Sequence, residues 1–516
     1  MICLFPNFFT IRRTGHIMVG SALTFARIGM NCEPIVVETD LKKGLPGISV
    51  TGMLSQEAKE ARERITPAIT NSGFDFPSKK ITINFSPAQT PKMGTHYDLA
   101  MAVSILRNQE ELDIAENAAF FGELSLGGEV KWVRGLLPLA VEAWKHGCEK
   151  IYIPYENRNE LSCIPPEKIV PIRRLEDIVN ENTSNSDETD IRITPKLETK
   201  HEDFSDIKGQ DDLIGYFLTA AAGNHHMLVV GPPGTGKTMC ASRLPGIMPD
   251  LTAEEIIDVN MIYSIASQSS SHSQWVSERP FRAPHSNSSM RALIGGGPKI
   301  LPGEISLAHK GILFLDEFLE FHADVLQALR TVLERKEVFL SMRSGSSIYP
   351  ADFLLIAAAN PCPCGYYETQ GICRCTMHDV IRYRRKLQNP LTDRIDIQIQ
   401  TDCVKYKTLN TYSKYSSAEM KLLVEHLRKK QLIRYTGENF YLNSDIPADK
   451  IRQYCPMSFD AERLLEKIMD EKILSARGCH KILRLARTLA DFNNEEIINE
   501  EDIKRASQMR CLDISV

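Results

Sequence analysis

One stretch of the chain combines a short apolar run, a glycine-rich turn and the expected start of a helix, in the order Leu228-Val229-Val230-Gly231-Pro232-Pro233-Gly234-Thr235-Gly236-Lys237-Thr238. The pattern G-x-x-x-x-G-K-T is complete in it. Glycines let backbone N–H groups surround a phosphate, and the N-terminus of the following helix adds partial positive charge. Lys237 would reach the β- and γ-phosphates, and the hydroxyl of Thr238 would bind Mg²⁺. Gly231 to Thr238 therefore predict a site for ATP and Mg²⁺, because a merely flexible loop would not need every fixed position.

Length and composition bound what surrounds this site. A chain of 516 residues is too long for one core and suggests about three domains. The net charge of −5 gives no overall support for nucleic-acid binding, so such binding must depend on local patches. No run approaches the roughly 20 apolar residues of a membrane span. The 13 cysteines, an odd count without a secretory signal, favour reduced thiols in the cytoplasm.

Apolar patterning divides the chain into segments. Regular patterns begin at Met18, so residues 1–17 are treated as an uncertain leader. Residues 18–180 mix strands and helices; we expect strands over 34–38 and 81–85 and helices over 55–72 and 98–106. Pro67 should kink or shorten the first helix. Residues 181–205 begin with an acidic run without apolar side chains and are expected to be a disordered linker. The later segments are expected to be a nucleotide-binding core over 206–405, a connecting helix over 406–432 and a helical lid over 433–516.

Two carboxylates follow a second apolar run, Ile312-Leu313-Phe314-Leu315-Asp316-Glu317. Such a run predicts a buried parallel strand with the acids at its carboxyl edge. Asp316 would hold Mg²⁺, and Glu317 would orient and polarise the attacking water. Acidic strand ends also occur by chance, but here they follow a complete phosphate loop.

Two later polar residues complete the predicted catalytic set. Asn360 ends the apolar run 353–359 and could sense the γ-phosphate, although it could equally cap a turn before Pro361. Arg394 lies just before a further expected strand. It is the candidate arginine finger, acting across a subunit boundary. The alternative is a surface arginine paired with Asp393 or Asp396.

Four cysteines lie between Asn360 and Arg394, as the pairs Cys362/Cys364 and Cys373/Cys375. Four thiolates suit a tetrahedral Zn²⁺ ion with a structural role, since no position is left open for a substrate. The one-residue gap within each pair is less diagnostic than C-x-x-C. The alternative is a cluster of free thiols.

Two local runs of basic residues could contact phosphate backbones: 381–386, which includes Tyr383, and 428–430. The alternative for both is a solvated helix face.

The order and spacing of these motifs resemble the AAA+ ATPases of the magnesium-chelatase/MCM-like branch. Three features carry the resemblance: the run 279–285 continuing to Gly297, a β-hairpin expected over 338–350 with Arg343 near its tip, and Ser475-Ala476-Arg477-Gly478 at the start of a helix. From Met18 onward, the chain resembles ComM/YifB-type magnesium-chelatase-like ATPases. The fold class expected from this resemblance is α/β: a P-loop AAA+ module with a parallel sheet and a helical C-terminal lid, preceded by an α+β Lon-protease-like domain.

The Lon-like resemblance depends on Gly44 to Gly47, residues 87–99 and residues 122–136. Lon-type catalysis needs a serine and a lysine. The expected serine position falls at His96 and the expected lysine position at or beside Leu137, while the neighbouring hydroxyl of Thr95 has no lysine partner. We therefore expect a non-proteolytic domain in which His96 is packed or at the surface.

The resemblance implies a hexameric ring that moves on single-stranded or branched DNA, a helicase promoting branch migration during recombination in natural transformation. It implies recombination proteins as partners, Arg343 as a DNA contact, and Arg477, with Arg484 in reserve, as a second phosphate-sensing arginine. Three alternatives stay open: a magnesium-chelatase-type motor that remodels a protein partner, an ATP-dependent protease, and a scaffold that only binds nucleotide. The Lon-like domain argues against the first, and the missing dyad against the second.

Overall fold

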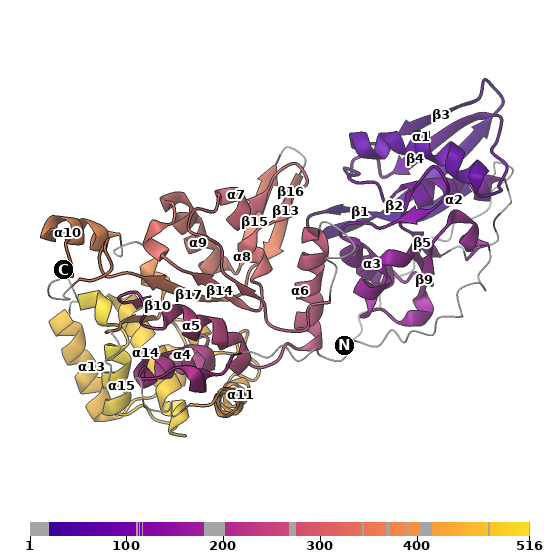
Figure 1. The fold of residues 1–516 in the computed structure, drawn as a ribbon. Coiled ribbons are helices and arrows are strands. Elements are labelled where there is room, and N and C mark those ends of the chain that lie inside the picture. Colours follow the sequence, from indigo (N-terminus) through magenta and orange to yellow (C-terminus); the bar gives the residue numbers. More distant parts are fainter. Residues whose placement is uncertain are drawn as a thin grey trace. The chain divides into compact units, whose positions relative to one another are not determined.

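The computed structural model (Figure 1) describes residues 20–109, 112, 114–115, 117–179, 202–267, 275–342, 345–367, 372–386, 391–402, 415–472 and 475–514. The expected leader, residues 181–201 of the expected linker, and Arg343 lie outside the described residues. The chain divides into two compact units, Met1–Ile193 with Ser267–Gln274, and Thr194–Ala266 with Trp275–Val516. Within the described ranges, no helix has the length and apolar character needed to cross a membrane.

The first unit is built on a mixed sheet. Its described strands form a seven-stranded sheet in the order β3-β4-β2-β1-β5-β8-β9. The bounds of these strands are β1 Gly20–Ile28, β2 Asn31–Lys42, β3 Gly47–Thr51, β4 Lys80–Ser86, β5 Ala118–Phe120, β8 Lys150–Pro154 and β9 Ile169–Ile172. A small ribbon joins β6 Glu123–Leu124 to β7 Val130–Lys131. In β4, Ile81, Ile83 and Phe85 alternate into the core, as a half-buried strand requires. The strands predicted over 34–38 and 81–85 are confirmed.

Three helices accompany this sheet: α1 Gln56–Asn71, α2 Asp98–Asn108 and α3 Leu136–Lys145. Helix α1 begins after Ser55, whose side chain accepts the N–H of Ala58. Of the two effects expected from Pro67, a kink or a shortened helix, the shortening is wrong, because the helix continues past Pro67 to Asn71. Helix α2 is buried from Asp98 to Leu106 and packs against β1 and β2, which explains its almost continuous apolar sequence.

The second unit is built on a parallel sheet. Its described strands lie in the order β11-β14-β17-β10-β18, with bounds β10 Met227–Val230, β11 Phe281–Arg282, β14 Ile312–Leu315, β17 Leu354–Ala359 and β18 Ile397–Gln400. Strands β10, β14 and β17 are buried along their whole length, as parallel strands covered on both faces are. The three buried strands predicted from the apolar runs are confirmed, as is the strand after Arg394.

Helices and two short ribbons surround this sheet (Figure 1). The helices are α4 Asp211–Gly223, α5 Lys237–Arg243, α6 Ala253–Ala266, α7 Met290–Ile294, α8 Glu304–Leu307, α9 Ala323–Arg335 and α10 Met377–Arg385. One ribbon pairs β12 Gly295–Gly296 with β13 Leu301–Pro302, and the other pairs β15 Glu337–Met342 with β16 Gly345–Pro350 in antiparallel register. The second ribbon confirms the predicted hairpin. Its arms carry an exposed cross-strand pair, Phe339 and Ile348.

The C-terminal part of this unit is helical, shown in orange and yellow in Figure 1. Its helices are α11 Ser417–Arg434, α12 Ile451–Tyr454, α13 Phe459–Lys472, α14 Ala476–Phe492 and α15 Glu500–Gln508. Ser475 caps α14 by accepting the N–H of Gly478, which confirms the predicted helix start. The predicted stripe Ile482, Leu485, Ala486 and Leu489 is buried in the core shared with the sheet.

Candidate nucleotide site

The carboxyl ends of three parallel strands bring the predicted catalytic residues together. The phosphate loop follows β10, Asp316 and Glu317 follow β14, and Asn360 follows β17. Val230 pairs with Ala359, and the N–H of Gly231 donates to the carbonyl of Ala359 at 3.0 Å. Leu315 pairs with Ala357. These side chains, far apart in the sequence, thus meet at one edge of the sheet, where α/β folds bind ligands.

The phosphate loop has the backbone that its sequence predicts. Gly234 and Gly236 have φ values of 79° and 82°, which glycine adopts without strain, and α5 begins directly after Gly236 at Lys237. The ammonium group of Lys237 is buried inside the loop. It donates to the carbonyl oxygens of Gly231 at 2.6 Å and Pro232 at 2.8 Å. The loop therefore holds a cation beside a ring of backbone N–H groups, a suitable place for phosphate oxygens.

The two predicted Mg²⁺ ligands are already in contact. The hydroxyl of Thr238 donates to Oδ2 of Asp316 at 3.1 Å. A hydroxyl and a carboxylate are the hard oxygen ligands that Mg²⁺ prefers, and it keeps several waters besides. These side chains fit a magnesium ion shared with the phosphates of a bound nucleotide.

Glu317 is held in an unusual backbone conformation beside Asp316. Its φ of 51° lies in the left-handed region, which costs a non-glycine residue energy and recurs at functional sites. Its side chain is exposed and accepts a hydrogen bond from Oγ of Ser286 at 3.2 Å. The arrangement presents an exposed carboxylate next to the Thr238–Asp316 pair.

Arg394 lies at the opposite edge of the same sheet. Strand β18 runs parallel to β10, with Ile397 paired to Met227 and Gln400 paired to Val230. Arg394 precedes Ile397, whereas the phosphate loop follows Val230. Four paired residues, roughly 13 Å of strand, therefore separate the two edges. The Nε atom of Arg394 donates to Oε1 of Glu334 at 2.8 Å.

Arg394 shares a surface pocket of about 290 Å³ with three other basic side chains, Arg477, Lys481 and Arg484. Arg477 is exposed at the start of α14, and Arg484 donates to the carbonyl of Ile446 at 2.9 Å. No residue of the phosphate loop lines this pocket. The two predicted arginines, Arg394 and Arg477, are thus brought together, but away from the phosphate loop of their own chain.

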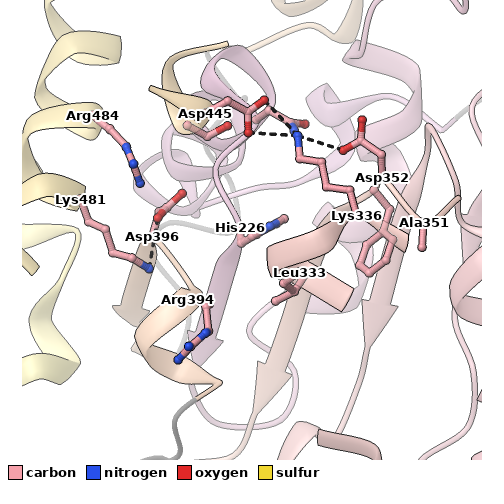
Figure 2. Close-up of a pocket in the computed structure, with 13 residues that line it drawn as sticks. His226, Leu333, Lys336, Ala351, Asp352, Arg394, Asp396, Asp445, Lys481 and Arg484 are labelled. Carbon is pink, nitrogen blue, oxygen red and sulfur yellow. Dashed lines mark hydrogen bonds and ion pairs between the residues drawn. The ribbon is translucent and has the colours of Figure 1, made fainter. Parts of the chain in front are cut away.

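An adjoining cavity of about 180 Å³ is drawn in Figure 2. Lys481 extends from α14 towards Asp396, with Nζ 3.3 Å from Oδ1. Nδ1 of His225 lies 3.2 Å from the other oxygen of this carboxylate. Although burial alone would raise it, Lys481 and His225 hold the pKa of Asp396 well below its usual range. This buried network joins α14 to the start of β18 and so fixes the helix that carries Arg477.

The four cysteines form one cluster. Their sulfur atoms all lie within 4.8 Å of one another. The Sγ atom of Cys362 is 3.4 Å from that of Cys364 and 3.9 Å from that of Cys373. A tetrahedral zinc ion with Zn–S bonds of ~2.3 Å places its sulfurs about 3.8 Å apart. The four thiols, all free, fit that geometry closely.

The positions expected for a Lon-type dyad hold core residues. His96 is buried against Tyr97 and Phe121, with Nε2 2.9 Å from the carbonyl oxygen of Phe25. Burial lowers the pKa of His96 to about 4. Leu137 is buried in α3. Of the two positions predicted for His96, packed or at the surface, the structure shows the packed one.

Several side chains of the two basic runs contact other parts of the fold. Arg428 donates to the carbonyl of Ala221 at 2.9 and 2.7 Å, and burial lowers its pKa to about 9. Lys430 lies 3.8 Å from the buried carboxylate of Asp491. Arg428 and Lys430 are therefore held by other parts of the fold, while Lys429 is exposed. In the run 381–386, Arg382 lies 3.7 Å from Asp379 and Lys386 donates to the carbonyl of Leu319 at 3.1 Å.

Sequence reasoning missed three participants: Ser286 beside Glu317, Glu334 beside Arg394, and Lys481 in the basic pocket. Ser286 and Glu334 each belong to a different helix or loop from the residue that they contact, whereas Lys481 lies on the same helix as Arg477 and Arg484. The available signal for Ser286 was the run 279–285 continuing to Gly297, within which it lies. The roles assigned to Lys237, Thr238, Asp316, Glu317, Asn360, Arg394 and Arg477 stay predictions.

Comparison with known proteins adds the family. Three family models match: "Magnesium chelatase, subunit ChlI" over residues 203–409, "Subunit ChlI of Mg-chelatase" over residues 37–157, and "Magnesium chelatase, subunit ChlI C-terminal" over residues 414–510. These matches lie in both compact units.

Individual relatives cover almost the whole chain. The uncharacterized protein YifB of Escherichia coli (strain K12) is 37% identical over 498 residues, 95% of this chain and 96% of YifB. The competence protein ComM of Haemophilus influenzae is 36% identical over 497 residues, 94% of this chain and 96% of ComM. A Lon protease of Azorhizobium caulinodans is 25% identical over 182 residues, 33% of this chain and 21% of the protease.

The fold class predicted from the sequence is confirmed, with an α/β module on a parallel sheet, a helical C-terminal part and a Lon-like α+β domain. Together with identity of more than a third along nearly the full length, this fold establishes the family. The chain belongs to the ComM/YifB-type, magnesium-chelatase-like AAA+ proteins.

Proposed function

We propose that this protein is an ATP-hydrolysing ring motor, a hexamer, that acts on DNA and promotes branch migration. The observation that carries the proposal is the separation of Arg394 from the phosphate loop at opposite edges of one sheet. A chain whose candidate finger cannot reach its own nucleotide needs a second copy to complete the site. A ring in which each subunit offers Arg394 to its neighbour satisfies every subunit at once.

In the proposed mechanism, ATP binds with its phosphates against the loop N–H groups and Lys237. Thr238 and Asp316, whose side-chain oxygens are 3.1 Å apart, would hold a Mg²⁺ ion, which would supply positive charge to the phosphates. Glu317 accepts a proton from the attacking water, and Asn360 helps to position that water. Arg394 of the neighbouring subunit stabilises the charge that develops on the γ-phosphate, an effect typically worth about 10³–10⁵ in rate.

Arg477 and Arg484 belong to the same neighbouring subunit in this proposal. They line the same pocket as Arg394, so this pocket contains three guanidinium groups. Glu334, whose pKa is lowered by the hydrogen bond from Arg394, keeps that guanidinium in place until a phosphate competes for it. The buried ion pair of Lys481 with Asp396 anchors α14 to the start of β18. Movement of the arginines would therefore be transmitted to the C-terminal helices.

Two observations support DNA as the substrate. The relative ComM is named a competence protein. The arms of the hairpin β15–β16 present the exposed Phe339 and Ile348 side by side, and an exposed aromatic ring can stack on a base. The expected contact from Arg343 belongs to the same hairpin.

We also propose that the four cysteines bind a structural Zn²⁺ ion. The support is the agreement between their sulfur separations and a tetrahedral tetrathiolate site. Four protein ligands leave no position for water or substrate, so the ion would order the loop rather than react.

The test is the ATPase rate with and without single-stranded, duplex and four-way-junction DNA at two salt concentrations. We expect stimulation that fades with salt and is greatest with the junction, because displaced counterions drive binding to phosphate backbones. The Glu317→Gln variant provides the control for contaminating ATPase.

A high ATPase rate that none of the three kinds of DNA changes would contradict the assignment of DNA as the substrate. It would favour the second candidate, a magnesium-chelatase-type motor that remodels a protein partner, which the three family matches support.

A further inference from the structure

The four cysteines belong to a segment that returns to the nucleotide site. The name "cysteine module" is used here for residues 361–367 and 372–386, which comprise the two cysteine pairs and helix α10. The module begins immediately after Asn360 at the end of β17. Cys362 is buried, Cys364 is exposed, and Cys373 and Cys375 are half-buried.

One turn of the module packs on the phosphate loop. The N–H of Gly365 donates to the carbonyl of Cys362 at 2.9 Å, which closes the turn between the first two thiols. Gly365 has φ +84°, and a Cβ placed on it would lie 3.0 Å from Cδ of Pro233 and 3.8 Å from Cγ of Asn360. The turn therefore lies close to both the phosphate loop and the side chain of Asn360.

The C-terminal end of the module also contacts the nucleotide site. Lys386 donates to the carbonyl of Leu319 at 3.1 Å, only two residues after Glu317. Arg384 lies over the ring of Tyr367, 4.2 Å from its centroid, and its Nε approaches the carbonyl of Pro361 at 3.4 Å. The module thus bridges three strand ends, those that carry Pro233, Asn360 and Glu317.

We propose that a metal ion on the four cysteines positions Asn360 and the loop at Pro233 for hydrolysis, so that removing the metal slows the chemical step. This inference deepens the proposed function and rests on it. Two cysteine pairs on either side of the module are cross-linked by one ion, and metal binding energy becomes ordering energy for the segment between its ligands. Loss of the ion leaves the Gly365 turn without that restraint.

The contacts also predict which kinetic constant changes. Lys237 is held by loop carbonyls and Thr238 by Asp316, all outside the module. Nucleotide affinity should therefore change less than kcat on metal removal. Asn360 and the segment after Glu317 touch the module directly, so kcat should fall about tenfold or more. A merely structural role would lower the folded fraction and leave kcat per folded molecule unchanged.

The first measurement is metal content, which needs no turnover. Purified protein should contain one zinc per chain, and metal-stripped protein should take up one Co²⁺ with the visible spectrum of a tetrahedral thiolate site. The Cys364→Ser/Cys375→Ser variant should lose this uptake. Cys479→Ser, a half-buried thiol in α14, is the matched control and should retain it. Absence of stoichiometric uptake by wild-type protein would overturn the proposal.

The second measurement separates the contact from the metal. Gly365→Ala places a methyl group against Pro233 without touching a ligand. It should keep one metal per chain and lose at least fivefold in kcat. Gly437→Ala is its control, since Gly437 has a similar φ of +90° and no atom within 4 Å of an added Cβ. Wild-type turnover in Gly365→Ala would contradict the coupling.

The third measurement is hydrogen exchange of the amides of residues 231–238, with metal bound and after chelation. We expect faster exchange after chelation, restored by adding Zn²⁺, and unchanged exchange would overturn the proposal even if the protein hydrolyses ATP. If wild-type protein hydrolyses no ATP at all, the proposed function fails, whereas the metal and exchange measurements still decide whether the module controls the loop.

Discussion

Thr238 and Asp316 are 78 residues apart in the sequence, and their side chains meet in a hydrogen bond of 3.1 Å. Thr238 comes from the first turn of α5 and Asp316 from the end of β14. The contact joins the phosphate loop to the acidic end of β14, so the two proposed magnesium ligands lie at one place.

Thr238→Ala and Asp316→Asn should each lower ATP hydrolysis on the order of 10²-fold or more, since each removes an oxygen ligand from the proposed ion. Both should raise the Mg²⁺ concentration needed for half-maximal rate. The double variant should be little worse than either single one, because the two groups act on one ion. Ser242→Ala, an exposed hydroxyl on the same helix, is the control. Unchanged magnesium dependence would refute the assignment.

Glu317→Gln should bind ATP with near wild-type affinity and hydrolyse it at least 10²-fold more slowly, because the amide keeps the shape but cannot accept a proton. Equilibrium binding of a fluorescent ATP analogue and the steady-state ATPase rate check the two parts. Ser286→Ala, which removes the hydroxyl 3.2 Å from Oε2, should have a smaller effect on rate. Normal turnover in Glu317→Gln would exclude it as the base.

Arg394→Ala and Lys237→Ala should each abolish hydrolysis, yet an equimolar mixture of the two variants should recover part of it. In mixed rings, an intact phosphate loop from one subunit can face an intact Arg394 from another. If Arg394 served its own chain, mixing would restore nothing. Arg463→Ala, an exposed arginine on α13, should behave as wild type alone. The measurement is ATPase rate against mixing ratio.

Acid should destabilise the second unit through two histidines, His309, which is buried, and His226, which is half-buried. Burial lowers the pKa of His226 and of His309 to about 4, from 6.5. Nδ1 of each accepts a backbone N–H, from Leu355 at 3.1 Å and from Asp352 at 3.0 Å, so the rings are neutral. The unfolded chain takes up protons near pH 6.5 and the folded protein only near pH 4. Stability is therefore complete above pH 6.5 and is lost as the pH falls between these values, by about 2 kcal/mol per histidine at pH 5.

Urea unfolding at pH 7.5 and pH 5 measures this loss. His309→Asn keeps an acceptor near the Nδ1 position without a titrating group, and should remove roughly half of the pH dependence. His426→Asn changes an exposed histidine and should leave the dependence as it is. An identical slope in all three proteins would show that His309 does not contribute.

Asp491→Asn should lower the free energy of unfolding by about 3–5 kcal/mol, because breaking a buried ion pair leaves its partner uncompensated. The carboxylate is fully buried, contacts Arg434 and Arg487, and accepts from Nδ2 of Asn443 at 2.9 Å. Asp470→Asn, on the exposed face of α13, should change it by less than about 0.5 kcal/mol. Thermal and urea denaturation provide the measurement, and equal stability of the two variants would contradict it.

The sequence by itself determined the elements of the nucleotide site. Gly231 to Thr238 specify a strand, turn and helix locally, because the glycines, the lysine and the flanking apolar run leave few other conformations. Asp316 and Asn360 end runs too apolar to lie anywhere but in a buried sheet. Since parallel strands share a carboxyl edge, their convergence followed from the pattern alone.

Tertiary structure alone decided what lies beside those elements. Arg394 is at the other edge of the sheet with Glu334, and Gly365 of the cysteine module packs on Pro233. Arg428, which the basic run suggested for DNA, instead caps the carbonyl of Ala221. Local patterns record how one segment folds and which face it buries. The order of strands and the partner of each buried charge depend on contacts between distant segments, and a single sequence carries no local signal for them.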